Sequence, residues 1–211
     1  MKRSKYFPLL ALAAAFNTSC IEMAHASTFP GAAGTIAPFS NKGHVYVATS
    51  FGVASTKMPT SPDFKAGESS NSLASSLSLG YTQQYNQSWD ILGELSYNYF
   101  GSSSSSNTSK TSTTSIDLAE IGSYHLNNRW SIMGKGGMAL LKANLQSNTK
   151  PSQKNEAIKP LVGIGALYRF NSQTSLQATY THYFGDTHYS NGTSTVPVVS
   201  SFLLGLQYTF S

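Results

Sequence analysis

The sequence contains eight segments in which apolar residues alternate with small or polar ones. Between Val45 and Val53, one set of alternate positions reads Val, Val, Thr, Phe and Val, and the other reads Tyr, Ala, Ser and Gly. A period of two is the signature of a β-strand with two unlike faces. The other segments cover 73–82, 89–99, 114–126, 130–138, 161–170, 176–181 and 202–210. None has helical spacing, so the sequence predicts an all-β protein.

The connections between these segments alternate in length. Long ones, rich in Ser, Thr, Asn, Gly and Pro, cover 54–70, 101–113, 143–156 and 185–196, and short ones cover 84–88, 127–128 and 171–173. This alternation predicts an up-and-down meander of eight antiparallel strands with all long connections at one end. The stretch 101–115 holds 8 Ser and 4 Thr in 15 residues, and we expect it to be flexible.

The scarcity of charge indicates which face meets the solvent. Only 11% of the residues are charged. The less apolar face of each segment carries mainly Ser, Thr, Ala, Gly and Asn, whereas a soluble barrel would show Lys and Glu to water. We therefore predict an eight-stranded antiparallel up-and-down transmembrane barrel over 43–210, with the apolar face toward lipid and the polar face toward the lumen. A soluble lipocalin-type barrel is the alternative.

Aromatic residues gather near the short turns and the C-terminus, as expected for a girdle at one membrane interface. We predict a periplasmic girdle that consists of Tyr81, Tyr85, Trp89, Tyr124, Trp130, Tyr168, Phe170, Tyr208 and Phe210. A second, looser set at the ends of the long connections consists of Phe51, Tyr97, Tyr99 and Phe184.

The first 26 residues have the three parts of a secretory signal peptide. A positive start is followed by an apolar stretch over 8–16 and by a small-x-small cleavage site, Ala24-His25-Ala26. We predict a signal peptide over 1–26, export through the general secretory route, and a periplasmic leading segment over 27–42.

The single cysteine, Cys20, lies within the predicted signal peptide, so we expect neither a disulfide nor a thiolate metal site in the mature chain. Lipidation of Cys20 is the alternative, although Asn17 stands where a lipoprotein signal has an aliphatic residue. The later histidines have no paired spacing, so no metal site is predicted. The formal net charge of +5 falls to about +3 without the signal peptide, which gives no support for a nucleic-acid partner.

Several charged residues fall on the face that we assign to the lumen: Asp90, Glu94, Asp117, Lys135, Lys159 and Arg169. Enclosed charges must pair, so we expect a polar network in which Glu94 and Asp117 neutralise Lys135. An eight-stranded barrel is only wide enough for side chains to fill. This width favours a closed structural core, and a narrow channel for small solutes is the alternative.

Glu120 departs from the pattern. Plain alternation from Ile116 and Leu118 places its carboxylate on the apolar face, where it would cost up to a few kcal/mol near the middle of a membrane. We therefore expect a β-bulge near Leu118 or Ala119 that turns Glu120 inward. A wrong assignment of faces in this segment is the alternative.

The last strand, Gly205-Leu206-Gln207-Tyr208-Thr209-Phe210, resembles the C-terminal signal of bacterial outer-membrane proteins. Together with the stretches 128–137 and 162–170, it makes the sequence similar to small eight-stranded outer-membrane barrels such as the OmpA transmembrane domain and OmpX. The resemblance implies a place in the bacterial outer membrane, contact with its lipid, and recognition by the barrel assembly machinery through Gly205–Phe210. It implies no catalytic residue and no cofactor.

A second resemblance concerns His188-Tyr189-Ser190-Asn191, which is similar to the His-x-Ser-Asn motif of outer-membrane lipid A deacylases. It would make His188 the base and Ser190 the nucleophile that attacks an acyl ester. The glutamate that this family has about a dozen residues after the serine is missing here, so a non-enzymatic role is favoured.

Loops on a rigid scaffold are the usual carriers of recognition. We therefore expect a non-enzymatic outer-membrane protein with a role in envelope integrity, in surface interaction such as adhesion, or in both. Its partners would be host or other surface proteins that meet the long extracellular loops.

Overall fold

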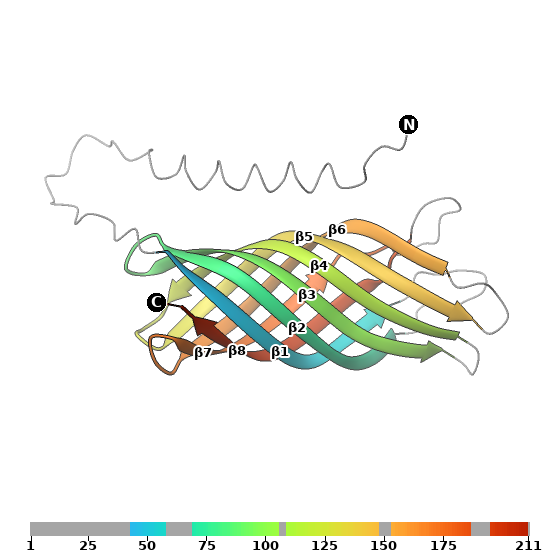
Figure 1. Ribbon diagram of the computed structural model, residues 1–211, viewed down its shortest axis with the longest axis horizontal. Coiled ribbons are helices and arrows are strands. Elements are labelled where there is room, and N and C mark those ends of the chain that lie inside the picture. The colour runs from blue at the N-terminus through green and yellow to red at the C-terminus, as the bar shows by residue number, and fades with distance from the viewer. Residues whose placement is uncertain (1–42, 58–68, 106–108, 148–152, 187–194, 211) are drawn as a thin grey trace, which may run out of the picture. The chain divides into compact units, whose positions relative to one another are not determined.

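The computed structural model describes residues 43–57, 69–105, 109–147, 153–186 and 195–210. These residues form the strands β1 (Gly43–Lys57), β2 (Ser69–Gln84), β3 (Trp89–Ser105), β4 (Ser109–His125), β5 (Trp130–Ser147), β6 (Gln153–Arg169), β7 (Thr174–Tyr183) and β8 (Val198–Thr209). Each strand pairs antiparallel with the next, and β8 pairs with β1, which closes the sheet into a barrel (Figure 1). The predicted eight-stranded up-and-down barrel is confirmed. Among the described residues, no helix has the length and apolarity needed to cross a membrane.

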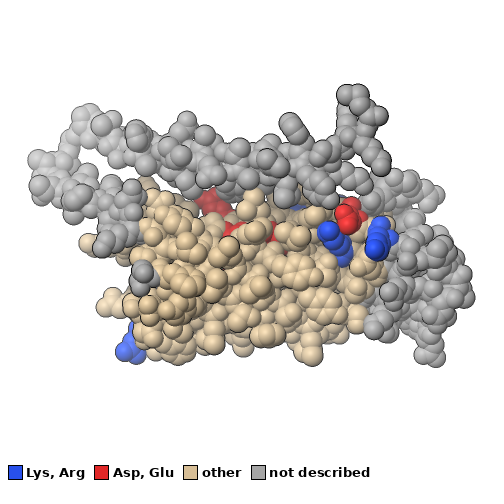
Figure 2. Space-filling model, in the orientation of Figure 1, with Lys and Arg blue, Asp and Glu red and all other residues tan. Residues whose placement is uncertain are grey.

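The two faces of the sheet have the predicted orientation. Large apolar side chains point outward, including Leu73, Ile164 and Phe51, which are 80%, 69% and 65% exposed. Inward positions carry small, polar or aromatic side chains such as Ser50 and Tyr46, which are buried. The barrel face drawn in Figure 2 is mostly free of charged side chains. A soluble barrel would have the reverse arrangement, so the lipocalin-type alternative is excluded.

The three short turns share one construction, in which an asparagine side chain accepts hydrogen bonds from two backbone N–H groups. In the first turn, Asn86 Oδ1 accepts from Ser88 and Trp89 at 2.8 and 2.9 Å. Asn127 and Asn171 make the same pair of contacts in the other two turns. Asparagine therefore fixes the end of the barrel where the short turns lie, as expected for Asx turns.

The strands at the other end are longer than the sequence indicated. Residues 101–105 extend β3 and residues 109–113 extend β4, so the prediction of a flexible connection over 101–115 was wrong for these residues. Positions 106–108 lie outside the described residues. The Ser and Thr runs pair across the two strands as far as Ser105 and Ser109. Polarity alone did not end the strands, because Thr has a high β-propensity and the backbone still pairs.

A register shift interrupts the pairing of β3 with β4 between Tyr99 and Ser102. Gly101 lies within the shift and has a φ of 78°, which favours glycine. A Cβ atom here would also lie 2.6 Å from Ser72 Cβ. The irregularity of this hairpin is therefore set by Gly101.

The predicted β-bulge near Leu118 or Ala119 was wrong. The pairing of β4 with β3 and with β5 is continuous through this region, and Glu120 is exposed on the outer face. Its cross-strand neighbours are Gly93 and Gly136. Because neither neighbour has a side chain, the carboxylate fits on the regular sheet without any distortion of the strand.

Candidate functional site

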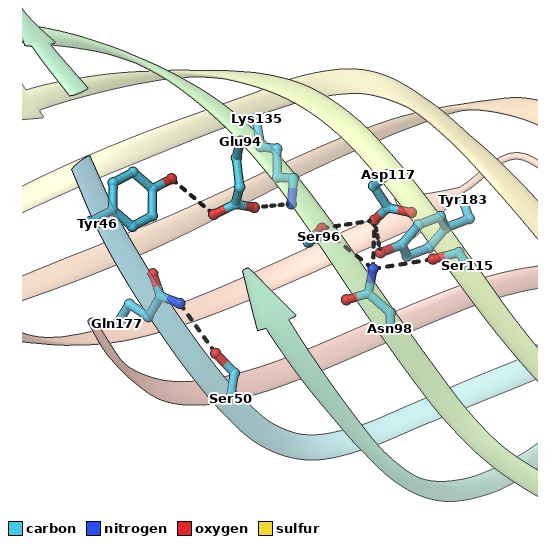
Figure 3. A network of polar contacts seen from close by, with 10 residues as sticks. All are labelled: Tyr46, Ser50, Glu94, Ser96, Asn98, Ser115, Asp117, Lys135, Gln177 and Tyr183. Carbon is cyan, nitrogen blue, oxygen red and sulfur yellow. Dashed lines mark hydrogen bonds and ion pairs between the residues drawn. The ribbon is translucent and has the colours of Figure 1, made fainter. Parts of the chain in front are cut away.

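The centre of the lumen holds an ion pair between strands that are not neighbours. Lys135 of β5 places its Nζ 2.7 Å from Glu94 Oε1 of β3. The Tyr46 hydroxyl of β1 donates a hydrogen bond of 3.0 Å to the other carboxylate oxygen, Oε2 (Figure 3). Glu94 is only 6% exposed. Both of its oxygens are therefore satisfied by groups from across the barrel, as a buried carboxylate requires.

Asp117 forms a separate cluster, which corrects the expectation that it neutralises Lys135. Its Oδ2 accepts hydrogen bonds from Asn98 Nδ2 at 2.7 Å and from the Tyr183 hydroxyl at 2.8 Å (Figure 3). Ser96 also donates to this oxygen, at 3.5 Å.

The register of β4 explains the separation. Lys135 pairs with Ile121 of β4, four residues along this strand from Asp117. The next inward side chain beyond Ile121 is Ala119, which pairs with Glu94. The lysine therefore reaches Glu94, and the donors that reach Asp117 Oδ2 are neutral, while its buried Oδ1 has no hydrogen-bond partner among the described residues.

The other predicted lumen charges lie toward the two ends of the barrel. At the short-turn end, Asp90 Oδ2 lies 3.0 Å from His125 Nε2. At the opposite end, Lys159 Nζ lies 2.5 Å from Asp186 Oδ1. Arg169 lines a cavity of about 320 Å³ at the short-turn mouth. The six predicted residues thus occupy different levels of the lumen and do not form a single network.

Two apolar layers close the lumen above and below the central ion pair. The layer toward the long connections consists of Ala54, Ala74, Phe100, Ala119, Ala139, Leu141, Leu161, Tyr183, Val196, Val199 and Leu203. The layer toward the short turns consists of Tyr46, Ala48, Leu92, Ile121, Met133 and Leu167. The cavity beside the ion pair measures about 30 Å³, room for only one or two water molecules. The described lumen is packed and contains no wide pore.

The return from the last long connection takes part in this closure. Thr195 and Val196 are buried at 4% and 0% exposure. The backbone N–H of Val196 donates to Asp186 Oδ2 at 3.1 Å. The residues just before β8 therefore pack inside the barrel at the end where the long connections lie.

The proposed nucleophile and base, Ser190 and His188, lie outside the described residues. A Ser–His–Asp contact does occur elsewhere, because His125 Nδ1 lies 2.8 Å from Ser131 Oγ and His125 Nε2 contacts Asp90. Ser131 is only 3% exposed and does not line the neighbouring cavity. A substrate could not reach it, so this contact stabilises the pairing of β4 with β5. No group of three or more potential metal ligands occurs in the described ranges.

The predicted girdle residues lie on the outer surface near the short turns. Trp89 and Tyr124 have ring centroids 5.0 Å apart, and Trp130 and Tyr168 have centroids 4.8 Å apart. Tyr208 is the last outward residue of β8 and is 42% exposed. Aromatic contacts thus join β3 to β4 and β5 to β6 at this end of the barrel.

Sequence reasoning missed the uncharged members of the lumen clusters, chiefly Tyr46, Asn98 and Tyr183. The alternation places Tyr46 and Asn98 on the inward face, and it places Tyr183 there when segment 176–181 is extended by two residues. A search of that face for hydroxyl and amide donors, in addition to charges, would have found them.

Comparison with known proteins identifies relatives of this architecture. The sequence matches the family described as OmpA-like transmembrane domain over residues 40–211. A comparison with curated proteins found no match.

Three solved structures illustrate the likeness in fold. Ail, the attachment invasion locus protein of Yersinia pestis, has a TM-score of 0.55 and 17% identity, with 78% of this chain and 98% of that chain covered. Neisserial surface protein A has a TM-score of 0.57 and 13% identity, with coverages of 79% and 97%. The N-terminal β-barrel domain of Pseudomonas aeruginosa OprF has a TM-score of 0.50 and 11% identity, with coverages of 80% and 100%.

Proposed function

Since this chain belongs to the OmpA-like transmembrane domain family and is an outer-membrane β-barrel, we propose that it acts without catalysis, by presenting its long connections at the cell surface. The observation that carries the proposal is the closed lumen. A barrel filled by side chains offers a rigid support for loops and no wide path for solutes.

The interior is built for rigidity. Its central ion pair joins β3 to β5 and accepts a hydrogen bond from Tyr46 of β1, and apolar layers lie on both sides of it. Opening a path would require Glu94 and Lys135 to separate and the aromatic side chains of both layers to move. This arrangement favours a structural lumen over the narrow-channel alternative.

Two structural relatives suggest the kind of surface role. Ail is named for attachment and invasion, and a structure of Ail contains the heparin analogue sucrose octasulfate. Neisserial surface protein A is likewise a surface protein. We propose an attachment role for this chain on the same pattern, with the hydroxyl-rich long connections as the contact surface and host or other surface molecules as partners.

The test is exchange of the long connections in cells that express the protein. Segments 58–68, 106–108, 148–152 and 187–194 are each replaced by a short Asn-Gly turn, and heat-modifiable gel migration checks that the barrel still folds. At least one replacement should lower cell adhesion, and replacement of the short turn 86–88 by another short turn should not. Unchanged adhesion for all four replacements would leave only a role in envelope integrity. Large, stable openings in planar-bilayer recordings would instead support a channel.

The C-terminal strand supports a further part of the proposal, recognition by the barrel assembly machinery. Leu206 and Tyr208 point outward from β8, at 52% and 42% exposure, and Phe210 follows at 49%. A strand end with a row of exposed apolar side chains is suited to transient pairing before β8 closes against β1.

A further inference from the structure

Glu120 occupies an unusual place on the outer surface of the barrel. It lies four residues along β4 from Tyr124 of the girdle and six from Thr114, which pairs with Tyr99 of the second aromatic set. At about 3.3 Å per residue and a tilt of about 40°, these intervals place the carboxylate about 10 Å from one aromatic row and about 15 Å from the other. Glu120 therefore lies near the middle of the lipid-facing belt.

No group in the described part of the chain satisfies this carboxyl. Neither a hydrogen bond nor an ion pair joins Glu120 to another described residue. Between the two aromatic rows, no other described Asp, Glu, Lys or Arg faces outward. An ionisable side chain within a membrane is costly, and where one persists it marks a functional contact.

Four glycines surround Glu120 on the same outward face. Gly93 and Gly136 are its cross-strand neighbours, and Gly122 and Gly134 form the next pair toward the short turns. We call these four positions the glycine notch. On the other strands, the one described outward glycine is Gly43 at the start of β1, where a Cβ atom would collide with the Tyr81 side chain.

The barrel itself does not require glycine at these positions. A Cβ atom on Gly93, Gly134 or Gly136 would meet nothing within 4 Å, and one on Gly122 would meet only Trp89 at 3.8 Å. The inward Gly137 differs, because a Cβ atom there would lie 2.3 Å from the Leu118 carbonyl oxygen. Glycine weakens a strand, so its use on an open surface indicates that another backbone approaches there.

We propose that the glycine notch is the contact surface of a homodimer within the membrane, in which Glu120 of one copy faces Glu120 of the second copy. Two copies inserted in the same direction are related by a two-fold axis along the membrane normal, so a residue near that axis meets its own counterpart at the same depth. A carboxyl group that carries its proton both donates and accepts hydrogen bonds, which makes it self-complementary.

The second copy is the occupant that the surface favours. Among the residues that the structure describes, the outward belt between the two aromatic rows offers no Lys or Arg, so a copy rotated to another contact would give Glu120 no cation as partner. Small residues allow membrane-spanning elements to approach closely, and polar side chains then bond across the contact. The notch supplies both features at one place.

The first experiment uses single cysteines in the full chain expressed in cells. Cys20 is the only cysteine, so a Cys20→Ser background has none. Gly122→Cys lies beside Glu120, and the control Leu206→Cys lies outward on β8, on the opposite side of the barrel. Because a disulfide needs Cα atoms within about 7 Å, oxidation of envelopes should give at least about tenfold more dimer with Gly122→Cys than with Leu206→Cys.

The second experiment tests the carboxyl and the notch separately in the Gly122→Cys background. Glu120→Leu should lower the yield of dimer roughly 3- to 20-fold, and Glu120→Gln should retain it, because an amide also donates and accepts. Gly136→Leu should abolish it by filling the notch. Heat-modifiable migration shows that each variant still forms the barrel.

Three results would overturn the proposal. They are equal dimer yields for Gly122→Cys and Leu206→Cys, an unchanged yield with Glu120→Leu, and a cross-linked product whose mass differs from twice that of the chain. The last result would identify a different protein as the occupant of the notch.

Discussion

Removing the central cation should strongly destabilise the barrel. Lys135→Met leaves the Glu94 carboxylate, 6% exposed, with the Tyr46 hydroxyl as its remaining partner in the structure. Loss of one member of a buried ion pair costs about 3–5 kcal/mol. The adjacent cavity of about 30 Å³ admits some water. We therefore expect the free energy of unfolding to fall by about 3 kcal/mol, at the lower end of that range.

A double-mutant cycle separates the ion pair from simple loss of packing. Glu94→Gln alone leaves the Lys135 ammonium in the lumen, where that side chain is 15% exposed, and should cost about 2–3 kcal/mol. The combined variant has no buried charge at this level, so it should cost less than either single change. The coupling energy should then reach about 2 kcal/mol or more.

The assay is urea unfolding of the protein refolded in lipid vesicles, followed by the fluorescence of Trp89 and Trp130. Lys142→Met is the matched control, because its pair with Glu156 is longer, at 3.4 Å, and the side chains are 36% and 42% exposed. That change should remain within about 0.5 kcal/mol. If Lys135→Met is as mild as the control, or if the double variant costs the sum of the two single ones, the reasoning about the buried pair is refuted.

The same unfolding assay tests three further changes. Gly137→Val should lower the free energy of unfolding by about 3 kcal/mol or more, or prevent folding, because its Cβ would lie 2.6 Å from the Ala119 Cα. The outward Gly136→Val should change the free energy of unfolding by less than about 0.5 kcal/mol. Equal effects of the two changes would contradict the assignment of faces. Asn127→Ala removes an acceptor for two backbone N–H groups and should cost about 1 kcal/mol, while the neighbouring Asn→Ala change at position 128 should be neutral. Tyr183→Phe removes a donor to a buried carboxylate, 2.8 Å away, and should cost about 1–3 kcal/mol; a loss below about 0.5 kcal/mol would show that this hydrogen bond adds little.

Plain alternation along the chain agrees with the faces of the eight strands because the side-chain period of a strand is fixed by its backbone, and the bulge that we expected in β4 was the departure from it that proved wrong. The same logic located the short turns and the outward aromatic residues. Its failures have specific causes. Polarity was taken to end β3 and β4, although a strand beyond a lipid belt can be wholly polar, as the serines paired as far as Ser105 and Ser109 show.

The expectation for Glu120 failed for a different reason. It assumed that a carboxylate could not face lipid, and it considered β4 without the glycines on β3 and β5 that flank it.

Contacts across the lumen could not be read from the sequence in the same way. Whether Glu94 or Asp117 reaches Lys135 depends on the register of β3, β4 and β5. Alternation shows which residues face the lumen. It does not show how far along the barrel axis each of them lies, because that depends on the stagger between strands.

The buried return of the last long connection limits where this protein can be engineered. Thr195 and Val196 plug the mouth, and Asp186 holds both the Val196 backbone and Lys159. An epitope tag or binding peptide grafted into this connection should therefore be confined to 187–194, with 195–197 left intact. A graft that replaced 195–197 as well would remove the side chains that close this mouth of the barrel. A weaker signal from the displayed peptide could then reflect an unfolded barrel and not a hidden peptide.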